Sequence, residues 1–229
     1  MPTFSGFPAG TVKFLRDLTK HNDRDWFNKN KARFESDVRE PALSFIEAMQ
    51  KPMAAFSECF DVVPKKTGGS LMRIYRDTRF SKDKTPYKTN VGIQFRHRAG
   101  GDVHAPGFYI HIDPAEIFFG AGMWHPASGP LFSVRESIAD DPDAWRKVRD
   151  QKAFTKHFEL VGDFLKRPPR GFDGDHPMIE DLKRKDFIGV CKLAHKDIES
   201  PQFVKLVMSR FKAAKSLVSF LCDAMSLPS

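Results

Sequence analysis

Two strands and the turn between them are predicted from residues 107–121, which read GFYIHIDPAEIFFGA. Apolar side chains recur at every second position over residues 107–113, and an apolar run follows over residues 116–121. The two runs meet at residues 113–116, Asp-Pro-Ala-Glu, and Asp and Pro favour a tight turn. The segment therefore predicts a β-hairpin.

The same period of two extends upstream of the hairpin. Residues 71–76 and 91–96 each have strand length and strand spacing, so the sheet-forming part of the chain is expected over residues 70–122. Residues 187–193 are a candidate fifth strand. Four to five strands in this order predict a mainly antiparallel sheet.

Helical spacing precedes and follows this region. It occupies residues 8–60 and 127–225, and the clearest apolar stripe runs along residues 201–225. Helices at both ends of a sheet-forming region predict an α+β fold, with the last helix on the apolar face of the sheet. The chain has 229 residues, no low-complexity linker and no internal repeat, so we expect a single domain over residues 1–229.

The composition indicates the cellular setting. The three cysteines, Cys59, Cys191 and Cys222, are widely spaced, so the sequence predicts neither a disulfide framework nor a thiolate metal site. No apolar run approaches the roughly 18 residues of a membrane-spanning helix, and residues 1–6 do not resemble a secretory signal. These features favour a cytoplasmic protein without a membrane partner.

Positive charge is concentrated in one part of the chain. The net charge is +8, and residues 73–98 contain eight basic side chains but only Asp77 and Asp83 as acidic ones. An excess of this kind favours anionic partners such as nucleic acids and phosphorylated metabolites.

The basic segment itself reads GGSLMRIYRDTRFSKDKTPYKT over residues 68–89. A strand is expected to enter a polar loop and return as a strand at Val91. Guanidinium groups bind carboxylate or phosphate in two-pronged fashion, and ammonium and hydroxyl groups can fill the remaining oxygen positions. The alternative is a solvated loop in which Asp77 and Asp83 form local ion pairs. The predicted anion-binding residues are Arg73, Tyr75, Arg76, Arg79, Lys82, Lys84, Tyr87 and Lys88.

Strand alternation indicates which side chains share a face. If Met72 faces the core, Arg73 and Tyr75 face away from it, and the same reasoning turns Tyr109 and His111 away from the core. The candidates for lining a pocket are Arg96, Tyr109, Trp124 and Arg135. Arg135 can either reach the anion or bind a structural carboxylate.

His111 is the one candidate for acid–base catalysis, because Asp113 follows it at the spacing of a strand face and could orient the imidazole. The alternative is an ordinary pair of polar residues on a strand. No third ligand stands at a convincing spacing, so no metal site is predicted.

The segment 68–89 resembles the signature of a conserved family of unknown function, whose members carry G-G-x-L-x-R-I-x-R-D-x-R-F-S-x-D-K-x-P-Y-K-T. The similarity extends to NDRDWF at residues 22–27, to PGFY at residues 106–109, and to GAGMW at residues 120–124 followed by Arg135. The family usually has Gly where this chain has Ala121. The resemblance covers most of the chain and implies no particular activity.

Three functions remain open. The first is a pocket protein, or an enzyme, that acts on a phosphorylated or carboxylated small molecule. The second is a nucleic-acid-binding protein with Tyr75, Tyr87 and Tyr109 as stacking surfaces. The third is an interaction module for an acidic partner. The chain has no dinucleotide or phosphate-loop fingerprint, so no cofactor is predicted. The sequence leaves open the oligomeric state and whether any reaction is catalysed.

Overall fold

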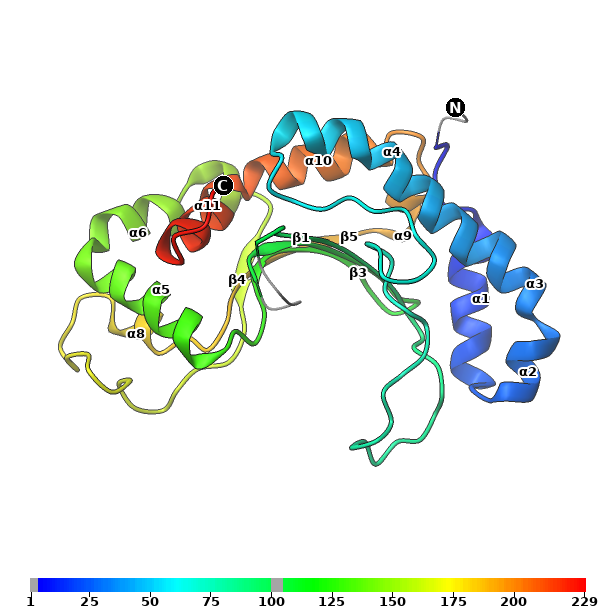
Figure 1. Ribbon diagram of the computed structural model, residues 1–229, viewed down its shortest axis with the longest axis horizontal. Coiled ribbons are helices and arrows are strands. Elements are labelled where there is room, and N and C mark those ends of the chain that lie inside the picture. The colour runs from blue at the N-terminus through cyan, green and yellow to red at the C-terminus, as the bar shows by residue number, and fades with distance from the viewer. Residues whose placement is uncertain (1–3, 100–104) are drawn as a thin grey trace. The chain divides into compact units, whose positions relative to one another are not determined.

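The computed structural model describes residues 4–99 and 105–229. The chain forms helices at both ends and strands between them, as the α+β prediction requires (Figure 1). In the described part of the chain, five strands form one antiparallel sheet in the order β1-β2-β3-β5-β4. The strands are β1 (Val91–Arg96), β2 (Gly107–Ile112), β3 (Ile117–Met123), β4 (Glu159–Val161) and β5 (Phe187–Leu193).

The helices before the sheet are α1 (Ala9–Lys20), α2 (Arg24–Lys29), α3 (Lys31–Phe34), the π-helix η1 (Glu35–Arg39) and α4 (Glu40–Phe56). The helices after β3 are α5 (Ser128–Asp140), α6 (Pro142–Arg149), α7 (Lys152–Thr155), α8 (Ile179–Leu182), α9 (His195–Ile198), α10 (Phe203–Ala213) and α11 (Lys215–Ala224). The π-helix ends just before Pro41, which has no N–H to donate to the preceding turn.

The residues group into two compact units. The first consists of Met1–Phe95, Tyr109–Phe119 and Lys192–Met208, and the second of Arg96–Phe108, Gly120–Cys191 and Ser209–Ser229. Each unit has its own buried aromatic residues.

The core of the first unit is built from phenylalanine side chains. Phe203 of α10 contacts Phe45 of α4 at a ring-centroid distance of 5.2 Å, and it contacts Phe119 of β3 at 5.9 Å. Phe7, which precedes α1, contacts both Phe45 and Phe203. These rings bury large apolar areas without polar tips, which explains why the sequence uses so many Phe and so few Tyr.

The second unit is organised around Trp145 of α6, which is fully buried. Its indole meets the ring of Phe187 edge-on at 5.6 Å and contacts Phe220 of α11 at 5.2 Å. Phe211 of α10 stacks on Phe108 of β2 at 4.4 Å. Together with the contact between Phe203 and Phe119, this stacking confirms the prediction that the residues after 201 pack on the sheet.

Three expectations about elements were wrong. Residues 71–76 do not form a regular strand, the expected helix over residues 201–225 is broken at Ala214, and β4 was not expected. Ala214 is buried with a ψ of 1°, and its N–H is shared between the carbonyls of Arg210 and Phe211. Neither Gly nor Pro marks this break, so packing decided it. The three-residue β4 is too short to show a period in sequence, and it is held by its pairing with β5.

Candidate functional site

The basic segment forms an irregular ribbon that extends away from β1 (Figure 1). Two isolated bridges hold it, one between Leu71 and Ile93 and the other between Tyr75 and Tyr87. These bridges fix the two ends of residues 71–76 but leave the middle without a continuous ladder. Between them the N–H of Met72 donates to the carbonyl of Gly92 at 2.9 Å, and the carbonyl of Ile74 accepts the N–H of Lys88 at 2.7 Å. Residues 71–76 thus pair first with β1 and then with the returning arm, so they do not form one continuous strand.

Met72 lies on the opposite face from the one its alternation predicted. A Cβ added to Gly92 would lie 2.8 Å from the Met72 sulfur and 2.8 Å from the Tyr109 hydroxyl oxygen. Met72 therefore shares a face with Tyr109, whereas Phe108 and Ile110 on the other face are fully buried. The bridge between Leu71 and Ile93 explains the reversal, because bridged residues share a face and their neighbours take the other.

Asn22 fixes the base of the ribbon. Its side-chain Nδ2 donates to the carbonyl of Tyr87 at 2.9 Å, and its Oδ1 accepts the N–H of Tyr87 at 3.0 Å. The ring of Tyr87 stacks on Phe27 of α2 at 4.1 Å. Asp23 caps α2 by accepting the N–H of Trp26 at 2.8 Å. The turn between α1 and α2 therefore holds the returning arm of the ribbon.

Two aspartates within the segment pair with two of its arginines. Arg76 donates from Nη1 to Asp83 and to Thr85. Arg79 binds Asp77 in two-pronged fashion, with Nε to Oδ1 at 3.0 Å and Nη2 to Oδ2 at 2.7 Å. These hydrogen bonds hold the pKa of Asp77 well below its usual range, and a backbone N–H from Thr85 together with Arg76 lowers the pKa of Asp83 to about 2. Local pairing therefore accounts for two of the predicted anion-binding cations.

The remaining cations of the segment form no ion pair with a carboxylate of the described residues. Lys84 donates from Nζ to the carbonyl of Thr78 at 2.9 Å, which is a neutral acceptor. The side chains of Arg73, Lys82 and Lys88 have no hydrogen bond or ion pair with any residue in 4–99 or 105–229. Burial lowers the pKa of Lys88, and the charge of Arg73 lowers it further. Positive charge thus remains uncompensated beside the ribbon.

Two adjoining hollows lie between the ribbon and the turn that precedes α2. The larger has a volume of about 780 Å³ and the smaller about 400 Å³. The larger is lined by Asn22, Asp23, Arg24, Asn28, Tyr75, Arg76, Thr78, Lys84, Thr85, Pro86 and Tyr87. The smaller is lined by Thr19, Asn22, Arg76, Asp83, Thr85, Tyr87, Lys88, Thr89 and Asn90.

The hollows bring together part of the predicted anion-binding set. Tyr75, Arg76, Lys84 and Tyr87 line the larger hollow, and Lys88 lines the smaller. The remaining three members, Arg73, Arg79 and Lys82, line neither hollow, and the same is true of the four pocket-lining candidates Arg96, Tyr109, Trp124 and Arg135.

Several lining residues come from the N-terminal helices and the turn between them, and none of them was among the predicted site residues. Asn22, Arg24 and Asn28 lie in the segment NDRDWFN, at least 40 residues before the ribbon. The resemblance of residues 22–27 to the family motif was the signal that could have found Asn22 and Arg24, whereas Asn28 lies outside it. Helical spacing alone indicates no binding role for this segment.

The sheet also carries a polar cluster around His111. Its Nδ1 lies 3.1 Å from the Tyr109 hydroxyl and 3.4 Å from Asn90 Nδ2, and its ring stacks on Phe118 at 4.6 Å. Burial raises the pKa of Tyr109 to about 12. The cluster joins the end of the ribbon to β2 through Asn90.

Asp113 does not orient His111 by a hydrogen bond. Its oxygens accept the N–H of Ala115 at 2.8 Å and the Thr89 hydroxyl at 3.5 Å, so it serves the turn between β2 and β3. Burial lowers the pKa of His111, while the charges of Asp113 and Glu116 oppose that shift. The hydrogen bond expected between Asp113 and His111 is therefore absent among the described residues.

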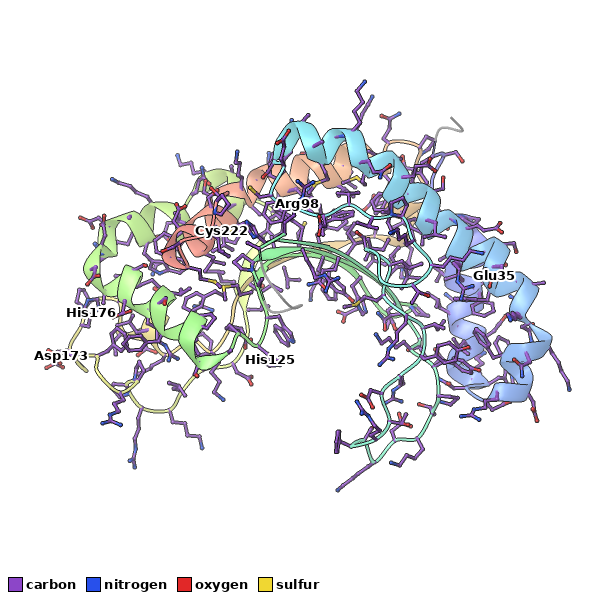
Figure 2. All side chains as sticks on the ribbon, viewed as in Figure 1. Glu35, Arg98, His125, Asp173, His176 and Cys222 are labelled. Carbon is purple, nitrogen blue, oxygen red and sulfur yellow. The ribbon has the colours of Figure 1, made fainter. Side chains whose placement is uncertain are left out.

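A second histidine, His125, contacts a buried carboxylate. His125, labelled in Figure 2, lies between β3 and α5. Asp186 is fully buried, and its Oδ1 accepts the main-chain N–H of His125 at 2.7 Å and lies 3.2 Å from His125 Nδ1. Its Oδ2 accepts the N–H of Asp163 at 3.1 Å. His125 has a left-handed φ of 49°, and its ring lies 4.4 Å from that of Trp124. Asp186 thus lies beside one ring nitrogen of an exposed imidazole, but the hydrogen bond between the two residues is to the main chain of His125.

Arg135 is buried within α5 and binds main-chain carbonyls. Its Nε donates to Leu182 at 2.7 Å and its Nη2 to Arg184 at 2.8 Å. Burial lowers the pKa of its guanidinium. Arg135 thus joins α5 to the last residue of α8 and to Arg184, and it forms no ion pair with a carboxylate of the described residues.

The fold and these hollows define a class: an α+β protein with a basic ribbon beside an open polar hollow. A family model described as conserved hypothetical protein (DUF2461) matches residues 10–220. The chain therefore belongs to that family. No protein with a curated description and no solved structure matches the chain.

Two further findings concern metals and membranes. Within residues 4–99 and 105–229, no three His, Cys, Asp or Glu side chains gather in a way that could hold a metal ion. No helix in the same part of the chain has both the length and the apolar character needed to cross a membrane.

Proposed function

We propose that this protein binds an anionic small molecule, phosphorylated or carboxylated, in the larger hollow. The observation that carries the proposal is the convergence of Arg24 and Lys84 on that hollow from two separate segments of the chain. Neither side chain forms an ion pair with a residue in the described part of the chain. A ligand carboxylate or phosphate would supply the charge that they lack.

Lys88 in the adjoining hollow supports the same proposal. Its lowered pKa means that the folded protein stabilises the charged ammonium less well than water does. A bound anion would offset both the burial of Lys88 and its repulsion from Arg73. The positions of Asn22 and Tyr87 fix the hollow before any ligand arrives, which limits the ordering cost of binding.

The test compares two lysines of the same loop. Both are exposed, but Lys84 lines the larger hollow and Lys82 lines neither hollow. Phosphate or sulfate at ~100 times its dissociation constant should stabilise the fold by about 2.7 kcal/mol. For a chain of this size that is roughly 5–10 °C in Tm. Lys84→Ala should reduce this rise, and Lys82→Ala should leave it unchanged.

Differential scanning fluorimetry across a series of phosphate, sulfate and carboxylate concentrations measures the effect. Chloride at equal ionic strength controls for general screening. The proposal fails if no anion raises the Tm of the wild-type protein beyond the chloride control. It also fails if the two lysine variants respond alike.

Nucleic acid is a second candidate partner, and one observation favours it. Phe80 is 95% exposed at the outer part of the ribbon, with the Arg79 guanidinium 5.8 Å from its ring centroid and Lys82 two residues away. Exposed aromatic side chains among cations suit base stacking on single strands. Of the tyrosines considered for this role, Tyr87 is buried against Phe27 and cannot serve.

A salt titration separates the two candidates. Binding through about six phosphates would weaken by roughly 10³ or more between 50 and 200 mM salt. We expect weak oligonucleotide binding that is lost near 150 mM salt, measured by fluorescence anisotropy. Sub-micromolar affinity that persists at that salt concentration would make nucleic acid the principal partner.

A further inference from the structure

The larger hollow has an aromatic wall that an inorganic anion would not use. Tyr75 lines it and is 54% exposed. Its ring contacts the ring of Tyr87 at 5.4 Å, and Tyr87 is itself held by Asn22 and Phe27. Tyr75 is therefore supported on one side while more than half of its surface stays uncovered. A supported and exposed ring beside a binding site is suited to stacking on a flat ligand group.

The polar groups of the hollow are of two kinds. Arg24 and Lys84 are cations, but Asp23 and Asn28 stand beside them in the same wall. Asp23 uses Oδ1 to cap α2, and Oδ2 makes no hydrogen bond within the described residues. A carboxylate repels an anion, so its presence beside the cations calls for a ligand that also brings hydroxyl or amine donors.

The size of the hollow also indicates a ligand larger than a single anionic group. Its volume of about 780 Å³ lies within the range typical of sites for drug-sized ligands, and it far exceeds what one phosphate group fills. An anion alone would leave Tyr75, Asp23 and Asn28 facing solvent.

We propose that the anionic ligand is a nucleotide. Its base stacks on Tyr75, its ribose hydroxyls donate to Asp23 and bond with Asn28, and its phosphate is bound by Arg24 and Lys84. This inference rests on the proposed anion site and deepens it. It assigns to the hollow a ligand class that neither the basic composition nor the family match supplies.

The decisive experiment separates the parts of the ligand. Isothermal titration calorimetry measures the affinity of the wild-type protein for the four nucleoside monophosphates AMP, GMP, CMP and UMP. The comparison ligands are adenosine, ribose 5-phosphate and inorganic phosphate. At least one nucleotide should bind more tightly than ribose 5-phosphate by roughly 5- to 150-fold, which is the contribution of one stacked base.

Substitutions at Tyr75 assign that difference to the ring. Tyr75→Ala should remove the advantage of the nucleotide over ribose 5-phosphate and leave the affinity for ribose 5-phosphate unchanged. Tyr75→Phe should keep the advantage, because the stacking face is retained. A purely structural role for Tyr75 would lower both affinities together. Circular dichroism confirms that each variant is folded.

Phe80 provides the matched control. It is an exposed aromatic residue of the same ribbon that does not line the hollow, so Phe80→Ala should leave nucleotide affinity unchanged. A single-stranded oligonucleotide that binds more tightly than any mononucleotide, and loses this on Phe80→Ala, would overturn the mononucleotide assignment in favour of a polymer.

The remaining outcomes distinguish this inference from the proposed function. If every nucleotide and ribose 5-phosphate bind equally, the nucleotide assignment is overturned and the anion site stands. If none of the compounds binds, inorganic phosphate included, the anion site itself is overturned.

Discussion

At the scale of single residues, Asn22 illustrates how one side chain places a loop that is distant in sequence. Its amide forms the two hydrogen bonds that a neighbouring strand would otherwise make with the main chain of Tyr87. No strand is available at that position, since the returning arm of the ribbon lies beside α2. The hollow therefore depends on Asn22 for its shape as well as for part of its lining.

Asn22→Ala should destabilise the fold by about 1–3 kcal/mol, because two hydrogen bonds of about 0.5–1.5 kcal/mol each are lost. Urea unfolding followed by circular dichroism measures the change. Asn28→Ala is the control, since Asn28 lines the same hollow but its exposed side chain has no hydrogen-bond partner in the described residues. Its effect should stay within about 0.5 kcal/mol. Equal effects of the two substitutions would argue against the anchoring role.

His111 gives the protein a predictable response to pH. Burial lowers the pKa of His111 in the folded protein, whereas the unfolded chain keeps a value near 6.5. As the pH falls below about 6.5, the unfolded chain binds more protons, so the free energy of unfolding falls. The contribution of His111 to the free energy of unfolding stops changing once the pH is below its folded-state pKa.

His111→Gln should flatten this response, because glutamine can pair with Tyr109 but cannot take up a proton. The free energy of unfolding, measured by urea titration at several pH values between 8 and 5, should fall less in the variant than in the wild type. A variant whose curve stays parallel to that of the wild type would show that His111 does not contribute to this pH dependence.

At the scale of elements, the close approach of β3 and β5 is possible because the chain has glycine at position 122. Gly122 has a φ of +124°, and a Cβ placed there would lie 2.1 Å from the carbonyl oxygen of Phe187. The neighbouring atom is main chain, so it cannot rotate away. β3 ends at Met123, and His125 two residues later donates its main-chain N–H to buried Asp186.

Gly122→Ala should therefore destabilise the protein by more than about 2 kcal/mol, combining an unfavourable φ with a main-chain clash. Gly129→Ala is the matched control, because Gly129 lies in α5 and has nothing within 4 Å of an added Cβ. Alanine there should stabilise the protein by up to about 1 kcal/mol. Thermal unfolding of both variants measures the difference in sign. A harmless Gly122→Ala would mean that β3 and β5 can separate without cost.

At the scale of the whole molecule, the boundary between the two compact units falls inside regular elements. It crosses β1, β2, β3, β5 and α10, and at none of these crossings does a polar linker mark it. Domain boundaries usually fall in exposed linkers with few contacts across them. We therefore propose that the chain is a single domain that unfolds as one unit.

Tryptophan fluorescence can test this directly, since Trp26 belongs to the first unit and Trp145 to the second. One variant keeps Trp26 through Trp124→Phe and Trp145→Phe, and another keeps Trp145 through Trp26→Phe and Trp124→Phe. In each variant the fluorescence midpoint in urea should coincide with that variant's midpoint by far-ultraviolet circular dichroism. Separate midpoints within one variant would establish two independently folding domains.

The sequence by itself determined the α+β class, the hairpin of β2 and β3, the strand β5 and the helical ends. These features follow from the spacing of apolar residues along short segments, which fixes the face that each segment buries. The ion pairs of Arg76 and Arg79 were also open to prediction, because their aspartate partners lie within seven residues.

Only the tertiary structure decided which side chains meet across long separations. Asn22 and Tyr87 are 65 residues apart, and His125 and Asp186 are 61 residues apart. Periodicity says which way a side chain faces within its own segment, but it carries no information about which other segment lies opposite. That choice depends on the packing of all the buried faces at once. For this reason the basic segment could be predicted from the sequence, whereas the hollow beside it could not.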